Sequence, residues 1–235
     1  MEQERIIQAG SAQPTAAFSA LMNKVYLWMT MGLAMTALAA GYVSQNVAWV
    51  QNIVTGFTPW ILMIAEIGLV FYLGSRIMSM SFAKAGILFA LYSLLNGVTL
   101  SVIFVAYTMP DITSAFLATA GTFGAMSIVG FFIKRDLSAM GRFLYMALIG
   151  LIIATVVNIF VASSSLSWII NYVGVLLFCG LTAYDTQKIK MMFLQYGDEV
   201  NEGTMKLALL GSLNLYLDFI NLFLYLLRIF ASDRE

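Results

Sequence analysis

The sequence predicts an all-α integral membrane protein with seven transmembrane helices. Apolar residues make up 61% of its 235 residues and charged residues 10%, whereas a soluble domain is roughly half apolar and a quarter charged. Seven mostly apolar segments approach or exceed the roughly 20 residues that a helix needs to cross a hydrocarbon core of about 30 Å. We therefore expect lipid to be the solvent for nearly the whole chain.

The predicted spans follow one another with short connections. They are Val25 to Val43, Pro59 to Met78, Ala85 to Tyr107, Thr113 to Ile133, Phe143 to Ala162, Trp168 to Gln187 and Lys206 to Phe230. The connections are too short to be domains. One membrane domain, 25–230, is therefore expected between an amino-terminal tail, 1–24, and a carboxy-terminal tail, 231–235.

The ends of the spans are marked by polar residues and prolines. A long polar tail ending in Lys24 precedes the first span, which favours a retained helix over a cleaved signal peptide. Pro59 opens the second span, where a missing N–H is harmless, and Pro110 marks a tight loop after the third. The third proline, Pro14, is in the tail, so no span is interrupted.

Cationic residues favour one set of loops and so predict the orientation. Ten of the twelve are Arg5, Lys24, Arg76, Lys84, Lys134, Arg135, Arg142, Lys188, Lys190 and Lys206, and the remaining two are Arg228 and Arg234. Cytoplasmic loops carry the excess of Lys and Arg. The amino terminus is therefore expected in the cytoplasm and the carboxyl terminus outside.

Composition excludes several classes of chemistry. The chain has no histidine, one cysteine and a net charge of zero. Histidine-based catalysis, an intrachain disulfide and a Cys cluster for metal are absent, and nothing indicates a nucleic-acid partner. No phosphate loop or nucleotide fingerprint appears, so we expect neither an enzyme nor a resident cofactor. Proton chemistry is left to carboxylates.

Ionisable residues inside the spans are the candidate functional residues. Glu66, Asp185, Asp218 and Arg228 each lie within a predicted span. A charged side chain at mid-helix costs about 2.5 to 3.5 kcal/mol on insertion scales, so each is a functional hypothesis by default.

The last span carries a polar stripe. Asn214, Asp218, Asn221, Tyr225 and Arg228 recur at spacings of four, three, four and three, which places them on one helical face. That face should meet protein or a water-lined cavity. The alternative is a stripe of interhelical hydrogen bonds that holds the bundle together without further function.

Asp185 lies near the cytoplasmic end of the sixth span, where it could also be an interfacial residue facing water. At about 1.5 Å per residue it lies about 25 Å from Trp168, while Asp218 lies about 18 Å from Lys206. The two aspartates match in depth only if the last helix begins before Lys206 or is displaced toward the cytoplasm.

Two long motifs resemble the Bax inhibitor-1, or transmembrane Bax inhibitor motif, family, and its bacterial members in particular. Gly180 to Lys190 reads GLTAYDTQKIK, and Leu213 to Phe230 reads LNLYLDFINLFLYLLRIF. The seven-span layout agrees over nearly the whole chain, as does the KRDLS stretch, 134–138, after the fourth span.

The resemblance implies a fold in which the last helix is central and is wrapped by the other six. It implies that Asp185 and Asp218 form a pH-sensitive latch in a calcium-permeable leak pathway. It further implies an ion pair between Glu66 and Arg228, and an arginine at the end of the second helix, Arg76, that approaches the aspartates. A bacterial inner (plasma) membrane location follows from the same resemblance.

The physics of paired carboxylates agrees with a latch. Two carboxylates in contact at low dielectric cannot both ionise cheaply, so they share a proton. Calcium takes about six to eight oxygen ligands, which Asp185, Asp218, Asn214 and Asn221 supply only in part. The expected function is a pH-sensitive calcium or cation leak channel whose ligands are protons and transient Ca²⁺.

Two other functions remain open. One is a regulatory protein without transport activity that modulates a membrane-bound quality-control protease, as some bacterial members of the family are associated with. The other is an intramembrane aspartyl protease, in which two aspartates on adjacent helices share a proton. Such proteases carry Gly-x-Gly-Asp on the second helix, but here Tyr216-Leu217 precedes Asp218.

Overall fold

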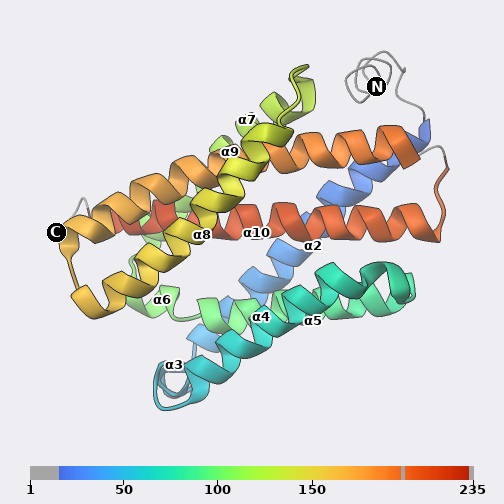
Figure 1. Cartoon of the computed structure of the whole chain (residues 1–235). Coiled ribbons are helices and arrows are strands. Elements are labelled where there is room, and N and C mark those ends of the chain that lie inside the picture. The colour runs from blue at the N-terminus through green and yellow to red at the C-terminus, as the bar shows by residue number, and fades with distance from the viewer. Residues whose placement is uncertain (1–15, 197–198, 233–235) are drawn as a thin grey trace. The chain divides into compact units, whose positions relative to one another are not determined.

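The computed structural model describes residues 16–196 and 199–232, and every regular element in this part of the chain is a helix (Figure 1). Seven of these helices are long and apolar enough to cross a membrane. The predicted all-α class with seven spans is therefore confirmed.

The spanning helices occur in the predicted order. They are α2 (Ala16–Ser44), α4 (Thr58–Arg76), α5 (Phe82–Leu100), α7 (Met109–Phe132), α8 (Ser138–Val161), α9 (Ser164–Tyr196) and α10 (Glu202–Ser232). Three short elements complete the set: α3 (Val47–Val54), η1 (Ile77–Ser79), which continues α4, and α6 (Ile103–Ala106), which continues α5.

Several helices are longer than the apolar runs that predicted them. The first begins at Ala16 rather than Val25, α9 continues to Tyr196, and α10 begins at Glu202 rather than Lys206. Polar residues extend these helices beyond the apolar stretch, where hydropathy gives no signal. The earlier start of α10 meets one of the two conditions under which Asp185 and Asp218 can match in depth.

Some predicted features fall at other positions or outside the described residues. Pro110 lies in the first turn of α7 rather than in a loop, where proline is tolerated because its missing N–H needs no partner. The remainder of the two predicted tails, residues 1–15 and 233–235 with Arg5, Pro14 and Arg234, lies outside the described residues.

Local side-chain caps account for several helix ends. Asn46 accepts hydrogen bonds from the backbone N–H groups of Ala48 and Trp49 at the start of α3. Ser81 likewise accepts from the N–H of Lys84 at the start of α5. Ala162, at φ 52°, ends α8 in the left-handed region, and its N–H donates to the carbonyl of Asn158. Such caps satisfy backbone groups that the helix itself leaves unpaired.

The helices divide into two compact units. Unit 1 contains 110–194 and 217–232, which are α7, α8, α9 and the second part of α10. Unit 2 contains α2 to α6 and the first part of α10, up to Tyr216.

In unit 2 the main packing is between α2 and α5. A Cβ placed on Gly97 of α5 would lie 2.5 Å from the backbone oxygen of Thr36 on α2, so only glycine allows this approach. Small residues at helix contacts are typical of membrane bundles, where close packing replaces the hydrophobic driving force. Tyr216 of α10 is fully buried and meets the rings of Phe89 and Tyr92 edge to face.

In unit 1 the helix α9 makes close contacts with its neighbours. A Cβ on Gly130 of α7 would collide with the backbone of Ala183 on α9. Gly174 of α9 makes room for the ring of Tyr225 on α10, which also stacks on Phe178. Phe219 of α10 packs edge to face on Phe116 and Phe123 of α7. The contact at Gly130 holds the part of α9 that carries Asp185 against α7, and the aromatic contacts pack α10 on both helices.

The last helix is the most buried of the seven spans. Within its most apolar stretch 67% of the residues are buried, compared with at most 39% in any other described span. It also supplies core residues to both units, Tyr216 to unit 2 and Phe219 to unit 1. This agrees with the central role that the family resemblance implies for the last helix.

Candidate functional site

Asp185 and Asp218 are the buried carboxylates of unit 1 that sequence analysis selected. Asp185 on α9 is 4% exposed and Asp218 on α10 is 5% exposed. Asp185 follows Ala183 by two residues, directly after the close approach of α9 to α7 at Gly130. The helix–helix contact that fixes Ala183 therefore also fixes the position of the Asp185 carboxyl group.

The two carboxyl groups interact electrostatically, so the structure brings this pair together. One oxygen of each, Oδ1 of Asp185 and Oδ2 of Asp218, has no hydrogen-bond partner among the described residues. Buried polar atoms are nearly always hydrogen-bonded, and an unsatisfied one is a common mark of a functional site. Each aspartate therefore has an oxygen that can still bind a proton or a cation.

Two hydroxyl groups of unit 1 share this property. The Oγ1 atom of Thr186, next to Asp185 on α9, and the Oγ atom of Ser127 on α7 are buried without a hydrogen-bond partner in the described part of the chain. Sequence analysis did not select either residue, because single hydroxyl residues in a span usually bond to the preceding turn of their own helix. Thr182, one turn before, does so and donates to the carbonyl of Phe178.

Tyrosine and lysine side chains border Asp185. The side chain of Tyr145 on α8 interacts with the Asp185 carboxyl group. The ring of Tyr145 meets the ring of Tyr184 edge to face, and the ammonium group of Lys188 lies 5.9 Å from the centre of the Tyr184 ring. The positive charge of Lys188 acts on Asp185 from one turn along the helix. Tyr145 is a site residue that sequence analysis missed, since it lies outside both motifs.

The remaining polar stripe of α10 is divided between the units. Asn214 is half-buried in unit 2, and Asn221 belongs to unit 1. The amide of Asn221 donates to the carbonyl of Leu217 on its own helix at 2.8 Å. Helical periodicity predicted that these side chains share one face of α10. The described hydrogen bond of Asn221 lies within α10 itself, so its role as a cation ligand stays a prediction.

Glu66 and Arg228 lie in different units. Glu66 of α4, in unit 2, accepts a hydrogen bond of 2.5 Å from the Thr99 hydroxyl of α5, and the Asn96 side chain of α5 also interacts with its carboxyl group. Arg228 of α10, in unit 1, is exposed and lies over the ring of Tyr225 at 5.5 Å. The ion pair between Glu66 and Arg228 stays a prediction. The structure shows in addition that Glu66 has two uncharged neighbours, Thr99 and Asn96, which the sequence did not indicate.

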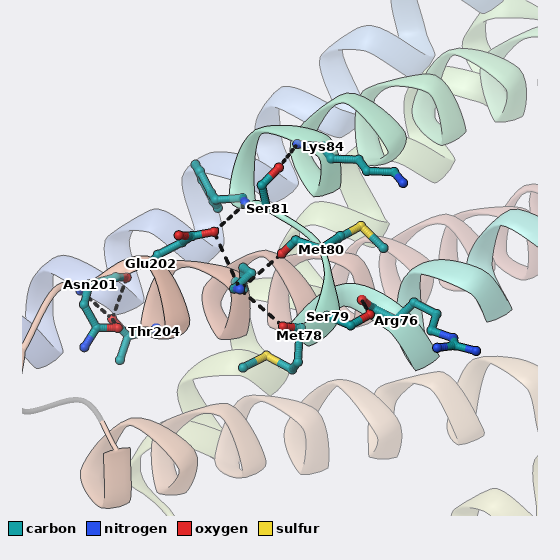
Figure 2. A network of polar contacts seen from close by, with 11 residues as sticks. Arg76, Met78, Ser79, Met80, Ser81, Lys84, Asn201, Glu202 and Thr204 are labelled. Carbon is teal, nitrogen blue, oxygen red and sulfur yellow. Dashed lines mark hydrogen bonds and ion pairs between the residues drawn. The ribbon is translucent and has the colours of Figure 1, made fainter.

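Figure 2 shows the turn between α4 and α5, where Arg76 is located. Lys206 of α10 donates to the carbonyl groups of Met78 and Met80 at 3.3 and 3.1 Å, and forms an ion pair of 3.6 Å with Glu202. Glu202 also accepts from the N–H of Phe82. These contacts fasten the turn to the start of α10.

Arg76 itself takes part in this turn through its backbone, because its carbonyl accepts from the Ser79 hydroxyl. Its exposed side chain extends away from the network in Figure 2. Arg76 belongs to unit 2 and the aspartates to unit 1, and its approach to them stays a prediction.

A corresponding turn of unit 1, between α7 and α8, is held by neutral groups of α9. Gln187 accepts from the N–H of Leu137 and donates to the carbonyl of Arg135, both at 2.8 Å. Within this turn Asp136 accepts from the N–H and the hydroxyl of Ser138. These hydrogen bonds lower the pKa of the Asp136 carboxyl group below its ordinary value. Gln187 thus links the KRDLS turn to the helix that carries Asp185.

The described residues contain no group of three or more acidic or cysteine side chains that could hold a metal ion. Asp185 and Asp218 together offer up to four carboxylate oxygens, fewer than the six to eight that calcium prefers. Hydroxyls, carbonyls or water would have to complete such a shell. The chemistry of this donor set fits a passing cation better than a resident one.

Seven apolar helices and a buried pair of aspartates on the last two of them define the class, a polytopic helical membrane protein with a buried acidic pair. Residues 19–235 match the protein family described as Inhibitor of apoptosis-promoting Bax1. The chain belongs to this family, the Bax inhibitor-1 family, which confirms the resemblance inferred from the two motifs.

Bacterial relatives match nearly end to end. The chain is 48% identical over 223 residues to the inner membrane protein YbhL of Escherichia coli, covering 94% of this chain and 95% of that protein. It is 45% identical over 210 residues to an uncharacterized protein of Deinococcus radiodurans, covering 88% of each. An uncharacterized protein of Rickettsia prowazekii is 43% identical over 216 residues, with 91% of this chain and 90% of that protein covered.

Proposed function

We propose that the chain is a pH-sensitive leak pathway for calcium or similar cations, opened and closed by Asp185 and Asp218. The observation that carries this proposal is the pair of buried, interacting carboxyl groups, each with an oxygen that has no described hydrogen-bond partner. A structural pair would be expected to use all its oxygens, because each unsatisfied buried polar atom destabilises the fold by about 1 to 3 kcal/mol.

The paired carboxylates supply proton sensitivity without a histidine. Two negative charges held close together in a low-dielectric interior repel strongly, so the pair is most stable when it holds one proton. That proton bonds the two side chains together and closes the pathway. When it leaves, the doubly charged pair repels itself and attracts a cation, so the proton and the cation compete for one site.

We further propose that the protein is not an enzyme and that it resides in an inner membrane, the location given in the name of its relative YbhL. The amino terminus would face the cytoplasm and the carboxyl terminus the outside, since most cationic residues fall on one set of loops. A reporter enzyme fused after Glu235 tests this orientation. Cytoplasmic activity of the reporter would contradict it.

Calcium flux into liposomes tests the transport proposal directly. The purified protein, reconstituted with a calcium dye inside the vesicles, is stepped between pH 8 and pH 5, and the flux is recorded at each step. We expect the flux of the wild type to change with pH. Asp185→Asn and Asp218→Asn should each abolish most of that change, and the double variant should resemble either single variant because the two residues act as one unit.

Asp111→Asn is the matched control, because Asp111 is also a buried carboxylate of unit 1 but lies at the start of α7. It should keep the pH response. Additive, independent effects of the two aspartate variants would contradict a shared proton.

Two other functions predict different results in the same assay. A regulator of a membrane-bound protease would give no flux above that of empty liposomes at any pH, and its activity would appear only with the protease present. An intramembrane aspartyl protease would cleave a transmembrane peptide, and either aspartate variant would stop the cleavage. Cation flux without cleavage supports the leak pathway against both.

A further inference from the structure

A hydrogen-bonded chain connects four helices within unit 2. Its members are Glu66 of α4, Asn96 and Thr99 of α5, Tyr216 of α10 and Thr36 of α2. We call it the Glu66 chain. Tyr216 is fully buried, and Thr36 and Asn96 are buried as well. The proposed leak pathway does not use this chain, and the predicted ion pair shares only Glu66 with it.

The contacts of the chain run from a carboxylate to a backbone carbonyl. The Thr99 hydroxyl donates to Glu66, the Asn96 side chain interacts with the Glu66 carboxyl group, and the Tyr216 hydroxyl donates to Oδ1 of Asn96 at 3.2 Å. The hydroxyl groups of Tyr216 and Thr36 are 2.6 Å apart, and either can donate. Thr36 also lies 2.9 Å from the carbonyl oxygen of Ser93 and 3.0 Å from that of Gly32, to either of which it can donate instead.

A count of protons allows only two complete directions for this chain. Each hydroxyl has one proton to donate, and the Asn96 amide has a donor side and an acceptor side. With Glu66 ionised, Thr36 donates to Tyr216, Tyr216 to Oδ1 of Asn96, and the amide N–H to the carboxylate. With Glu66 protonated, the acid donates to Asn96, the amide to Tyr216, Tyr216 to Thr36, and Thr36 to the Ser93 carbonyl.

We propose that Glu66 is a second proton-binding site of this protein and that proton uptake there reverses the direction of the Glu66 chain. The reversal needs a half-turn of the Asn96 amide and rotation of the two hydroxyl groups. The added proton stays on Glu66 and every other proton stays on its own residue, while the Thr36 hydroxyl exchanges Tyr216 for the Ser93 carbonyl as its acceptor. The end of the chain on α10 is Tyr216, two residues before Asp218.

Few ionisable groups surround Glu66. Within unit 2 the titratable groups that act on it are Tyr92 of α5 and Tyr216 of α10. The other elements packed against α4, which are α3 and η1, carry no charged residue. Arg76 lies about 15 Å from Glu66 along α4, and Lys84 at the start of α5 lies about 22 Å along α5 from Thr99. Arg228 of α10 is the predicted partner of Glu66.

Infrared difference spectroscopy of the reconstituted protein between pH 8 and pH 5 tests this proposal without any flux measurement. Protonation of a carboxylate produces a carbonyl band, and a changed hydrogen bond shifts the ring and C–O modes of a tyrosine. We expect one carbonyl band that Glu66→Gln removes and one tyrosine shift that Tyr216→Phe removes. Because the signals are coupled, Glu66→Gln and Asn96→Leu should also remove the tyrosine shift.

Two variants and one labelling experiment keep the result decisive. Tyr72→Phe, which changes an exposed tyrosine on the same helix as Glu66, should leave both signals in place. Thr99→Val removes a side branch, the donor to Glu66, but leaves the path from Glu66 through Asn96 and Tyr216 to Thr36, so the two signals should still change together. If Tyr216→Phe or Asn96→Leu does not fold, ring-labelled tyrosine in the wild type assigns the tyrosine shift without mutation.

A tyrosine shift that persists in Glu66→Gln would overturn the proposal, as would the absence of a Glu66 carbonyl band at any pH. The latter is the outcome expected if Arg228 keeps Glu66 ionised throughout. The proposal deepens the proposed function, and it rests on that function only for its effect on the leak. A pH-independent flux with intact spectral signals would reject the leak gating and keep the Glu66 site.

Discussion

The two units of this protein treat their buried polar groups in opposite ways. In unit 2, the Glu66 chain satisfies its hydroxyl, amide and carboxylate groups with one another. In unit 1, Asp185, Thr186, Asp218 and Ser127 each keep a buried oxygen without a described hydrogen-bond partner. Among the described residues, no buried side-chain oxygen of unit 2 is left in that condition.

This difference separates a network whose polar groups bond to one another from a site whose oxygens can still accept a bond. A fully bonded buried network rigidifies its surroundings, because any rearrangement must replace every bond that it breaks. Oxygens without partners are destabilising by themselves and become favourable only when a proton, a cation or water reaches them. Unit 2 thus has the features of a fixed framework in which only the direction of the hydrogen bonds changes. Unit 1 has those of a site that binds and releases a proton, a cation or water.

Removal of the Tyr216 hydroxyl should have the largest effect on stability. Tyr216→Phe leaves Asn96 and Thr36 without their shared partner, and we expect unfolding in detergent to become about 1 to 3 kcal/mol easier. Thermal unfolding followed by circular dichroism measures this. Tyr72→Phe is the exposed control. An unchanged midpoint in Tyr216→Phe would mean that water replaces the hydroxyl and that unit 2 is not a closed network.

The pairing of Glu66 with Arg228 should be the next largest effect. A double-mutant cycle with Glu66→Gln and Arg228→Gln should give a coupling of about 1 kcal/mol, at the upper end for exposed pairs, since Arg228 is exposed. The losses of stability in the two single variants should then add up to more than the loss in the double variant. A coupling of zero would leave Thr99 and Asn96 as the sufficient partners of Glu66.

Replacement of an aspartate in unit 1 should change stability less than the Tyr216 variant does. Asp218→Asn should alter the free energy of unfolding by less than about 1 kcal/mol or stabilise the fold, because the lost oxygen had no described partner and a repelling charge disappears. The same detergent assay measures it. A loss as large as that of Tyr216→Phe would show that the comparison between the units is wrong.

The smallest effect is expected at Asp136, outside the spans. The hydrogen bonds from Ser138 lower the pKa of this carboxyl group in the folded state below its ordinary value of 3.8. Its contribution to stability is therefore present above that value and is lost as the pH falls through the lower folded pKa. Asp136→Asn should cost about a few tenths of a kcal/mol at pH 7, because water screens an exposed charge.

The cost of the same variant should shrink as the pH falls through the lowered folded pKa of Asp136, because the wild-type carboxyl group then becomes protonated as well. Unfolding midpoints of the two proteins, measured across this range, should converge as the pH falls. Ser138→Ala should reproduce part of the effect, since it removes the hydroxyl donor. A difference that grows toward low pH would contradict the assigned cause.

The sequence alone determined the number of spans, their order and the family. Long apolar runs can only be satisfied in lipid, and backbone groups in lipid must be bonded within helices, so composition and length were sufficient. The same reasoning selected Asp185, Asp218 and Glu66, since a charge in an apolar run is conspicuous. It placed Pro110 in a loop and began α10 at Lys206, because hydropathy does not register polar helical residues.

Tertiary structure decided which polar groups have partners. Tyr145, Asn96 and Tyr216 lie among apolar residues and look in the sequence like ordinary bundle residues. Their roles depend on side chains that are far away in the chain, such as Thr36, which is 180 residues from Tyr216. Periodicity gives the face of a helix but not the atom opposite it. The distinction between a satisfied and an unsatisfied buried oxygen therefore exists only after the helices have packed.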